Sequence, residues 1–181
     1  MVMANPVVAT IVQRIPELRL PDCWLAAGSL FQTVWNTLSG RDLQAGILDY
    51  DINYFDASDL SWHAEDRSIR RATDLFADLE VTVEVRNEAR VHLWYEAKYG
   101  TPCPPYRNTP HAVSTFPNCS SCLAVRAGSD GLQVYAPFGF TDLFSMTIRP
   151  NPVLAPAAVY DAKARRWTQQ WPTLTVLPWP C

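Results

Sequence analysis

GSLFQTVWNTLSGRDLQAGILDYDINYF, residues 28–55, is the stretch that decides the fold. In its first part, apolar residues recur at helical spacing, which predicts a helix over residues 29–39 with Ser29 as its N-cap. In its last part, apolar and polar residues alternate, which predicts a strand over about residues 47–55. The stretch therefore reads as a helix, a polar turn and a strand.

The predicted strand carries two carboxylates on one face. Side chains on a strand alternate between its two faces, so Asp49 and Asp51 point the same way, with Asn53 next in line. Two such charges roughly 7 Å apart repel each other unless a cation or a set of donors lies between them. Paired carboxylates suit Mg²⁺ (or Mn²⁺), with substrate phosphates completing the metal's shell. The opposite face is apolar: Leu48, Tyr50, Ile52 and Tyr54.

The turn before the helix supplies candidate phosphate ligands. Cys23–Ala27 is expected to form a helix or a tight turn, with Gly28 at the bend. Gly28 allows close approach of the backbone, and a helix N-terminus offers N–H groups to a phosphate, so Gly28 and Ser29 are candidate nucleotide-binding residues. The stretch as a whole predicts a metal-bound nucleoside triphosphate between the helix start and the strand.

The order Gly-Ser, helix, Asp-x-Asp strand resembles the nucleotidyltransferase superfamily typified by DNA polymerase β. Three longer stretches resemble one uncharacterised bacterial branch of it, the nucleotidyltransferase family proteins formerly classed as a domain of unknown function. The resemblance covers roughly residues 20–180 and is more specific in these stretches than in the short motif. They are VEVRNEARVHLWYEAKYG (83–100), YAPFGFTDLFSMTIRPN (135–151) and WPTLTVLPWP (171–180).

The resemblance implies a third catalytic and metal-binding carboxylate on a neighbouring strand. Glu84 is at the matching position, so Asp49, Asp51 and Glu84 form the implied catalytic and metal-binding set. The residues alone show only that Glu84 lies on the polar face of a strand over 80–86, where an ion pair with Arg86 is the alternative. Glu80 and Glu88 are weaker candidates for the third carboxylate, because one is at the strand edge and the other follows the strand.

Two arginines and a histidine follow on the same segment. Arg86 and Arg90 are candidate nucleotide-binding residues, because a planar guanidinium matches the geometry of phosphate; surface ion pairs are the alternative. His92 could serve as a general base, although a structural role is the more common use of a lone histidine.

The rest of the chain predicts an α+β fold with a short mixed sheet flanked by helices, as in the polymerase β-like fold. We expect a single domain over residues 1–181, with a core at about 20–100 and a C-terminal extension at about 101–181. Further helices are expected at 7–19 (broken by Pro16), 64–79, 87–99, 141–146 and 156–170, and a hairpin at 120–126 and 132–136.

Composition narrows the class of protein. A net charge of −3 argues against broad non-specific binding of nucleic acid, without excluding a local basic patch. The chain has no apolar run long enough to span a membrane and no good signal peptide, so a cytoplasmic location is expected. Five cysteines then indicate free thiols. Cys119 and Cys122 form a lone CxxC, either a metal or redox site or two small buried side chains.

The hypothesis is a metal-dependent nucleotidyltransferase that moves a nucleoside monophosphate from a nucleoside triphosphate to an acceptor hydroxyl. The acceptor is left open: a small metabolite, an antibiotic, a protein side chain or an RNA end. The alternatives are a non-catalytic nucleotide-binding or regulatory module on the same fold, a phosphohydrolase, and a structural protein in which Asp49 and Asp51 are strand-edge charges.

Overall fold

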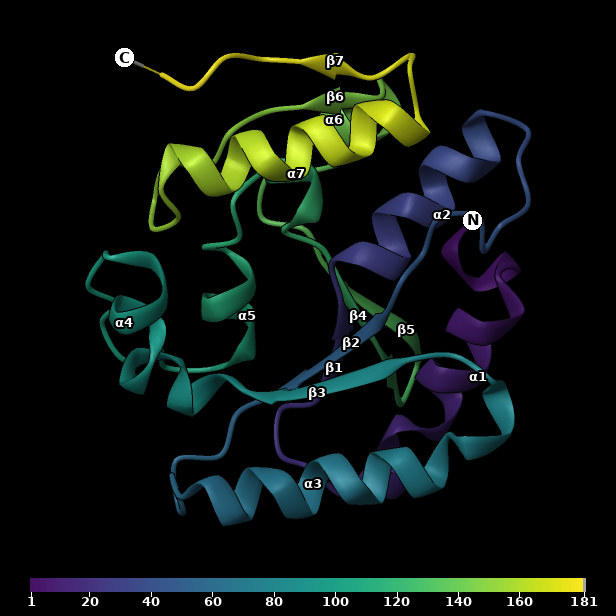
Figure 1. Ribbon diagram of the computed structural model, residues 1–181. Coiled ribbons are helices and arrows are strands. Elements are labelled where there is room, and N and C mark those ends of the chain that lie inside the picture. Colours follow the sequence, from purple (N-terminus) through teal and green to yellow (C-terminus); the bar gives the residue numbers. More distant parts are fainter. Residues whose placement is uncertain (181) are drawn as a thin grey trace.

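The computed structural model describes residues 1–180. Its centre is a mixed five-stranded sheet in the order β3-β2-β1-β4-β5 (Figure 1). β2 and β3 are parallel, and the other neighbours are antiparallel. The α+β fold class with a mixed sheet is therefore confirmed. The strands of this sheet are β1 (Trp24–Ala26), β2 (Tyr50–Tyr54), β3 (Val83–Asn87), β4 (Ala124–Gly128) and β5 (Gly131–Tyr135), and β6 (Thr147–Ile148) and β7 (Thr175–Val176) form a second, two-stranded sheet.

The central strand β1 was missed by the sequence reading. The helix or tight turn expected over Cys23–Ala27 is wrong, because Trp24, Leu25 and Ala26 form a strand that pairs with β2 on one side and β4 on the other. All three side chains are buried, so the alternation that marks a half-exposed strand is absent.

The alternation predicted for β2 is confirmed. Tyr50, Ile52 and Tyr54 are at most 2% exposed and belong to the main hydrophobic core. The strand begins at Tyr50 rather than near residue 47, so Leu48 lies outside it and is 60% exposed. The same core includes Val7 near one end of the chain and Leu174 near the other.

The helices mostly follow the predicted ranges. Ser61 caps α3, its Oγ accepting from the N–H of Ala64, but α3 ends at Leu75. The helix expected over 87–99 is a 3-10 segment, η4 (Glu88–Leu93), followed by α4 (Tyr95–Tyr99). No helix in residues 1–180 is both long and apolar enough to cross a membrane. The other helices are α1 (Pro6–Arg14), α2 (Gly28–Leu38), α3 (from Trp62), α5 (Thr109–Val113), α6 (Thr141–Phe144) and α7 (Ala157–Gln170).

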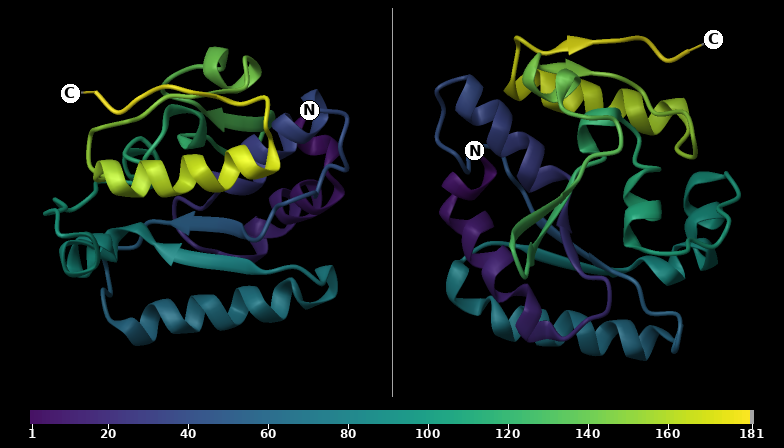
Figure 2. Two further views of the ribbon diagram at one scale, coloured as in Figure 1. Left: turned by 45° about the horizontal axis from the view of Figure 1, so that its top comes forward. Right: turned by 180° about the vertical axis from the view of Figure 1, so that it is seen from behind.

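α7 lies on the other side of the molecule from α3, which runs beside β3 (Figures 1 and 2). Four aromatic rings join α7 to α2, with centroids 4.7–5.9 Å apart. The indole N–H of Trp171 also donates to the side-chain oxygen of Asn36 at 3.0 Å. These contacts fix α7 against the helix that follows β1. The rings are Phe31, Trp35, Trp167 and Trp171.

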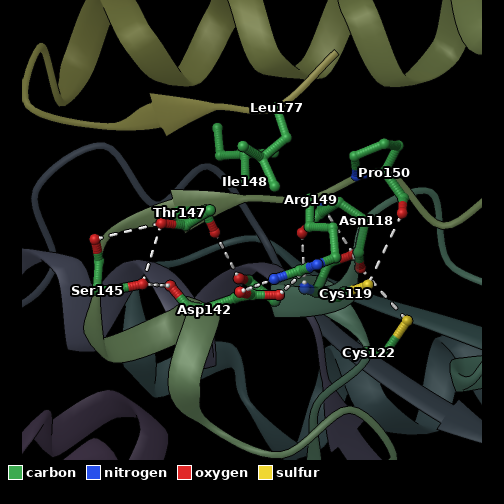
Figure 3. A network of polar contacts seen from close by, with 12 residues as sticks. Asn118, Cys119, Cys122, Asp142, Ser145, Thr147, Ile148, Arg149, Pro150 and Leu177 are labelled. Atoms are coloured by element: carbon green, nitrogen blue, oxygen red, sulfur yellow. Dashed lines mark hydrogen bonds and ion pairs between the residues drawn. The ribbon is translucent and has the colours of Figure 1, made fainter. Parts of the chain in front are cut away.

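The CxxC segment is part of a polar network that ties the C-terminal segments together (Figure 3). The N–H of Cys119 donates to the carbonyl of Arg149, and Arg149 makes a bidentate ion pair with Asp142 at 2.7 and 2.9 Å. Cys119 and Cys122 are buried free thiols, which confirms the reading as small buried side chains. Cys23 and Cys103 are also free, and Cys181 lies outside the described residues.

Candidate active site

A cleft of about 330 Å³ opens on the polar face of the sheet. Residues from α2, β2, β3, η4, α4 and α7 line it, and so do residues just after α5. Figure 1 shows how the elements that contribute lining residues, among them α2, β2, β3, α4 and α7, are arranged. The volume is in the range of cavities that hold one small ligand.

The carboxylates of Asp49 and Asp51 converge on Gly28 at the start of α2. A Cβ atom placed on Gly28 would lie 3.8 Å from Oδ1 of Asp49 and 3.8 Å from Oδ2 of Asp51. The same atom would lie 3.1 Å from Nε2 of Gln32, which is tight. The absent side chain therefore leaves a cradle between the helix start and the two carboxylates.

The sharp turn into α2 is made by Ala27 rather than by Gly28. Ala27 has φ 53° and ψ −116°, a conformation that costs an L-residue strain energy. Ala27 is also the N-cap, so the expectation that Ser29 caps the helix is wrong. Ser29 is fully buried, and its hydroxyl has no partner among residues 1–180. The backbone N–H groups of Gly28 and Ser29 likewise have no partner in that part of the chain.

Glu84 lies directly opposite Asp51 on the parallel strand β3. The pKa of Asp51 is raised to about 7, mainly by burial and then by the charges of Asp49 and Glu84. Within residues 1–180, no three His, Cys, Asp or Glu side chains are gathered closely enough to hold a metal ion. Glu84 is half-exposed and 3.7 Å from Arg86, so the ion pair considered in the sequence reading is present.

The two candidate arginines have different places. Arg86 lines the cleft, where its guanidinium lies 5.5 Å from the ring centre of Trp94. Arg90 does not line it: it donates to the carbonyl of Leu60 and forms a buried ion pair with Glu65. The expectation that Arg90 contacts phosphate is therefore corrected: Arg90 is not in the cleft, and its guanidinium is bound to Leu60 and Glu65 instead.

Several cleft residues were missed by the sequence reading, because they come from distant segments. Lys163 and Arg166 of α7 line the cleft, and Lys163 is close enough to Asp51 for its positive charge to lower the pKa of that carboxyl. Burial lowers the pKa of Lys163 itself. Their spacing of three residues places both on one face of α7, which is the only local signal. Gln32, Asn53 and Lys98 also line the cleft.

The end of the cleft next to η4 and α4 is aromatic. It contains one further carboxylate, Glu88, which the sequence reading ranked as a weak candidate and which is 5% exposed. His92 does not line the cleft, and its Nδ1 is buried without a partner in residues 1–180, which favours the structural role. The aromatic residues there are Trp94, Tyr95, Tyr99 and Tyr106, which pack in one cluster.

Comparison with known proteins agrees with this geometry. An NMR structure described as revealing a CCA-adding enzyme head domain superposes with a TM-score of 0.79. The two sequences are 22% identical, and the match covers 97% of this chain and 92% of that one, so it shows a shared fold. No curated protein sequence matches the chain. A family model described as nucleotidyltransferase matches residues 13–176. The chain therefore belongs to this nucleotidyltransferase family.

Proposed function

We propose that the protein moves a nucleoside monophosphate from a nucleoside triphosphate to an acceptor hydroxyl, with a divalent metal ion held in the cleft. The observation that carries the proposal is the convergence of Asp49 and Asp51 on Gly28 at the start of α2. It brings two candidate metal ligands next to the N–H groups of Gly28 and Ser29, which have no partner in residues 1–180, and a metal-bound triphosphate requires both kinds of group.

The residues present fit Mg²⁺ or Mn²⁺. Asp49 and Asp51 would hold the ion, with the substrate phosphates completing its shell. Glu84 lies opposite Asp51, but the three carboxylates are not gathered closely enough within residues 1–180 for it to be a third ligand. Burial raises the pKa of Asp51 most and the charges of Asp49 and Glu84 add to it, and a bound cation would relieve that repulsion. When bound, the metal would polarise the phosphate and lower the pKa of the attacking hydroxyl.

The chain's own groups would position the triphosphate. The N–H groups of Gly28 and Ser29 would donate to its terminal phosphates, and the buried Ser29 hydroxyl is a further donor without a partner in residues 1–180. Lys163 and Arg166 would pair with the phosphate charges from the α7 side. Catalysis would then rest on positioning and on stabilising the charge that develops on the phosphoryl group.

Equilibrium binding of ATP, GTP, CTP and UTP, with and without Mg²⁺, tests the proposal. We expect Mg²⁺-dependent binding by the wild type and its loss in the Asp49→Asn/Asp51→Asn variant. The matched control is Asp74→Asn/Asp130→Asn, since both of these residues are exposed and outside the cleft. Equal binding by the two double variants would refute the assignment of Asp49 and Asp51. Binding without release of pyrophosphate in an acceptor screen would favour the non-catalytic alternative.

A further inference from the structure

Glu88 is a buried carboxylate for which the proposed mechanism has no use. It follows directly after β3, lines the cleft and is 5% exposed. No hydrogen bond or ion pair joins its carboxylate to another residue in the described range 1–180. The charges of Arg86 and Asp51 act on Glu88, and the charge of Glu88 acts in turn on Cys103 and Tyr106. A buried carboxylate without a donor is costly, so its position in a cleft points to a ligand that supplies one.

The surroundings of Glu88 suit a flat ring. Trp94 and Tyr99 line this end of the cleft, and aromatic side chains are surfaces on which nucleobases stack. The hydroxyl of Tyr106 shares a 2.8 Å hydrogen bond with Thr115, so Tyr106 is already paired and presents its ring. This end therefore offers aromatic rings for stacking and the carboxylate of Glu88, which only accepts hydrogen bonds when it is ionised.

Glu88 directly follows β3, the strand that carries Glu84, so it lies beyond the proposed phosphate site along the same strand. With the terminal phosphates at Gly28 and the α-phosphate at the carboxylates of β2 and β3, the rest of the nucleotide extends along β3. Glu88 is four residues beyond Glu84, roughly 13 Å of extended chain. The inference about Glu88 rests on the proposed function, because the base can lie next to Glu88 only when the triphosphate is bound at Gly28.

We propose that Glu88 selects a guanine nucleotide as the donor substrate. The two oxygens of a carboxylate can accept from two adjacent N–H donors at once. Of the four common bases, guanine alone presents two adjacent donors, N1–H and the 2-amino group, on its Watson–Crick edge. Adenine, cytosine and uracil place an acceptor next to the donor, which would face a carboxylate oxygen and leave the pair unmatched.

Binding of GTP, ITP, ATP, CTP and UTP in the presence of Mg²⁺ tests this proposal. Burial raises the pKa of Glu88 to about 8, so the titrations are made at about pH 8.5, where the carboxylate is mostly ionised. We expect the wild type to bind GTP about tenfold or more tightly than ATP, which is the usual size of a bidentate discrimination. ITP lacks the 2-amino group and should bind with an affinity between those of GTP and ATP.

The variant Glu88→Gln should bind GTP no more tightly than ATP. Its control is Glu96→Gln on α4, which makes the same chemical change at an exposed position outside the cleft and should keep the preference. Circular dichroism establishes that both variants are folded, and a neutral amide at position 88 removes no existing contact.

The possible results separate this inference from the proposed function. A wild type that binds all four common nucleotides equally, or a Glu88→Gln variant that keeps the GTP preference, would overturn the role of Glu88 alone. The second result is also what is expected if Glu88 contacts the acceptor instead of the base. Failure of the wild type to bind any of the five nucleotides with Mg²⁺ would overturn both proposals.

Discussion

Asp51 and Glu84 are directly opposite each other on the parallel strands β2 and β3. Two like charges at neighbouring strand positions destabilise a sheet unless something compensates for them. Here the positive charges of Lys163 and Arg86 act on Asp51 from α7 and β3. These positive charges offset part of the repulsion between the carboxylates at the point where we place the metal.

The pKa of Asp51 should fall when Glu84 is neutralised. Burial and the charge of Asp49 are the larger causes of the raised value of about 7, so Glu84→Gln should lower it modestly and Asp49→Asn by more. Carboxyl ¹³C chemical shifts followed against pH in metal-free protein measure the change. Glu80→Gln, an exposed residue outside the cleft, is the control; a pKa of Asp51 that responds equally to all three changes would contradict this geometry.

Gly28→Ala should separate stability from nucleotide binding. Gly28 is helical and not in the left-handed region, so alanine should leave stability unchanged or raise it by up to about 1 kcal/mol. The new methyl group would fill the cradle between Asp49 and Asp51 and press on Gln32, so Mg²⁺-dependent nucleotide binding should weaken at least about tenfold, or about 1.4 kcal/mol. Urea denaturation and calorimetric titration measure the two effects.

The control for that variant is Gly40→Ala, which should behave in the opposite way. Gly40 has φ 63° and no heavy atom within 4 Å of an added Cβ, so alanine would be strained there without touching the cleft. We expect a loss of about 1 kcal/mol in stability and unchanged binding. Unchanged binding in Gly28→Ala as well would argue against a ligand in the cradle.

The sequence contained enough to predict much of this site. The alternation predicted that Asp49 and Asp51 lie close together, and both carboxylates do lie near Gly28, although β2 begins at Tyr50 and Asp49 directly precedes it. The Gly-Ser pair precedes a helix with a clear apolar stripe, so the helix start was also predictable. Features that depend on the residue pattern of a single strand or helix, such as the carboxylate pair and the start of α2, could therefore be predicted from the sequence.

The rest depends on contacts between distant segments. β1 is three residues long and buried on both faces, so it has no period to detect. Arg86 and Arg90 differ only by four positions, but the strand ends at Asn87 and η4 turns the second arginine away from the cleft. The charge of Lys163 acts on Asp51 because α7 packs on α2 through aromatic rings. No local sequence pattern predicts this packing of two distant helices.

Lys163→Met should weaken nucleotide binding. Lys163 lines the cleft near Asp49 and Asp51, and we assign it to the triphosphate, so loss of its charge should raise the dissociation constant at least about tenfold. Arg165→Met is the matched control, because Arg165 is exposed on the same helix and does not line the cleft. Titration calorimetry with Mg²⁺ and GTP measures both, and equal dissociation constants for the two variants would remove Lys163 from the site.

Glu88 should make the protein less stable as the pH rises. Its pKa is raised from 4.5 to about 8 in the folded protein, so the folded state binds a proton that the unfolded state has lost between these values. The contribution of Glu88 is therefore fully present below about pH 4.5 and declines by up to about 1.4 kcal/mol per pH unit until about pH 8.

Comparing the stability of the wild type with that of Glu88→Gln at each pH isolates the contribution of the Glu88 carboxyl, because the two proteins share every other titratable group. We expect the variant to be more stable than the wild type at about pH 9, with the difference shrinking towards about pH 5. Urea denaturation across this range provides the measurement, in the absence of nucleotide. Two stability curves that run parallel from end to end would show that Glu88 is not protonated in the folded state.

The ion pair of Arg90 with Glu65 should be needed for folding, in contrast to Arg86. The Arg90 and Glu65 side chains are 12% and 2% exposed, and Glu65 also accepts from the N–H of Asn87 at 2.8 Å. This pair ties η4, which carries Glu88, to α3. Removing one partner leaves a buried charge unpaired, so Arg90→Met or Glu65→Gln should each cost about 3–5 kcal/mol of unfolding free energy.

Arg86→Met should weaken nucleotide binding and leave the stability of the protein nearly unchanged, the reverse of what is expected for Arg90→Met. The Arg86 guanidinium is 42% exposed and lies 3.7 Å from Glu84, so its loss should cost about 1 kcal/mol of stability or less. Because Arg86 lines the cleft, its loss should weaken Mg²⁺-dependent nucleotide binding, while folded Arg90→Met protein should bind nearly as the wild type does. Denaturation and nucleotide titration on both variants test this contrast. A large loss of nucleotide binding in stably folded Arg90→Met protein would show that Arg90 contacts the phosphates.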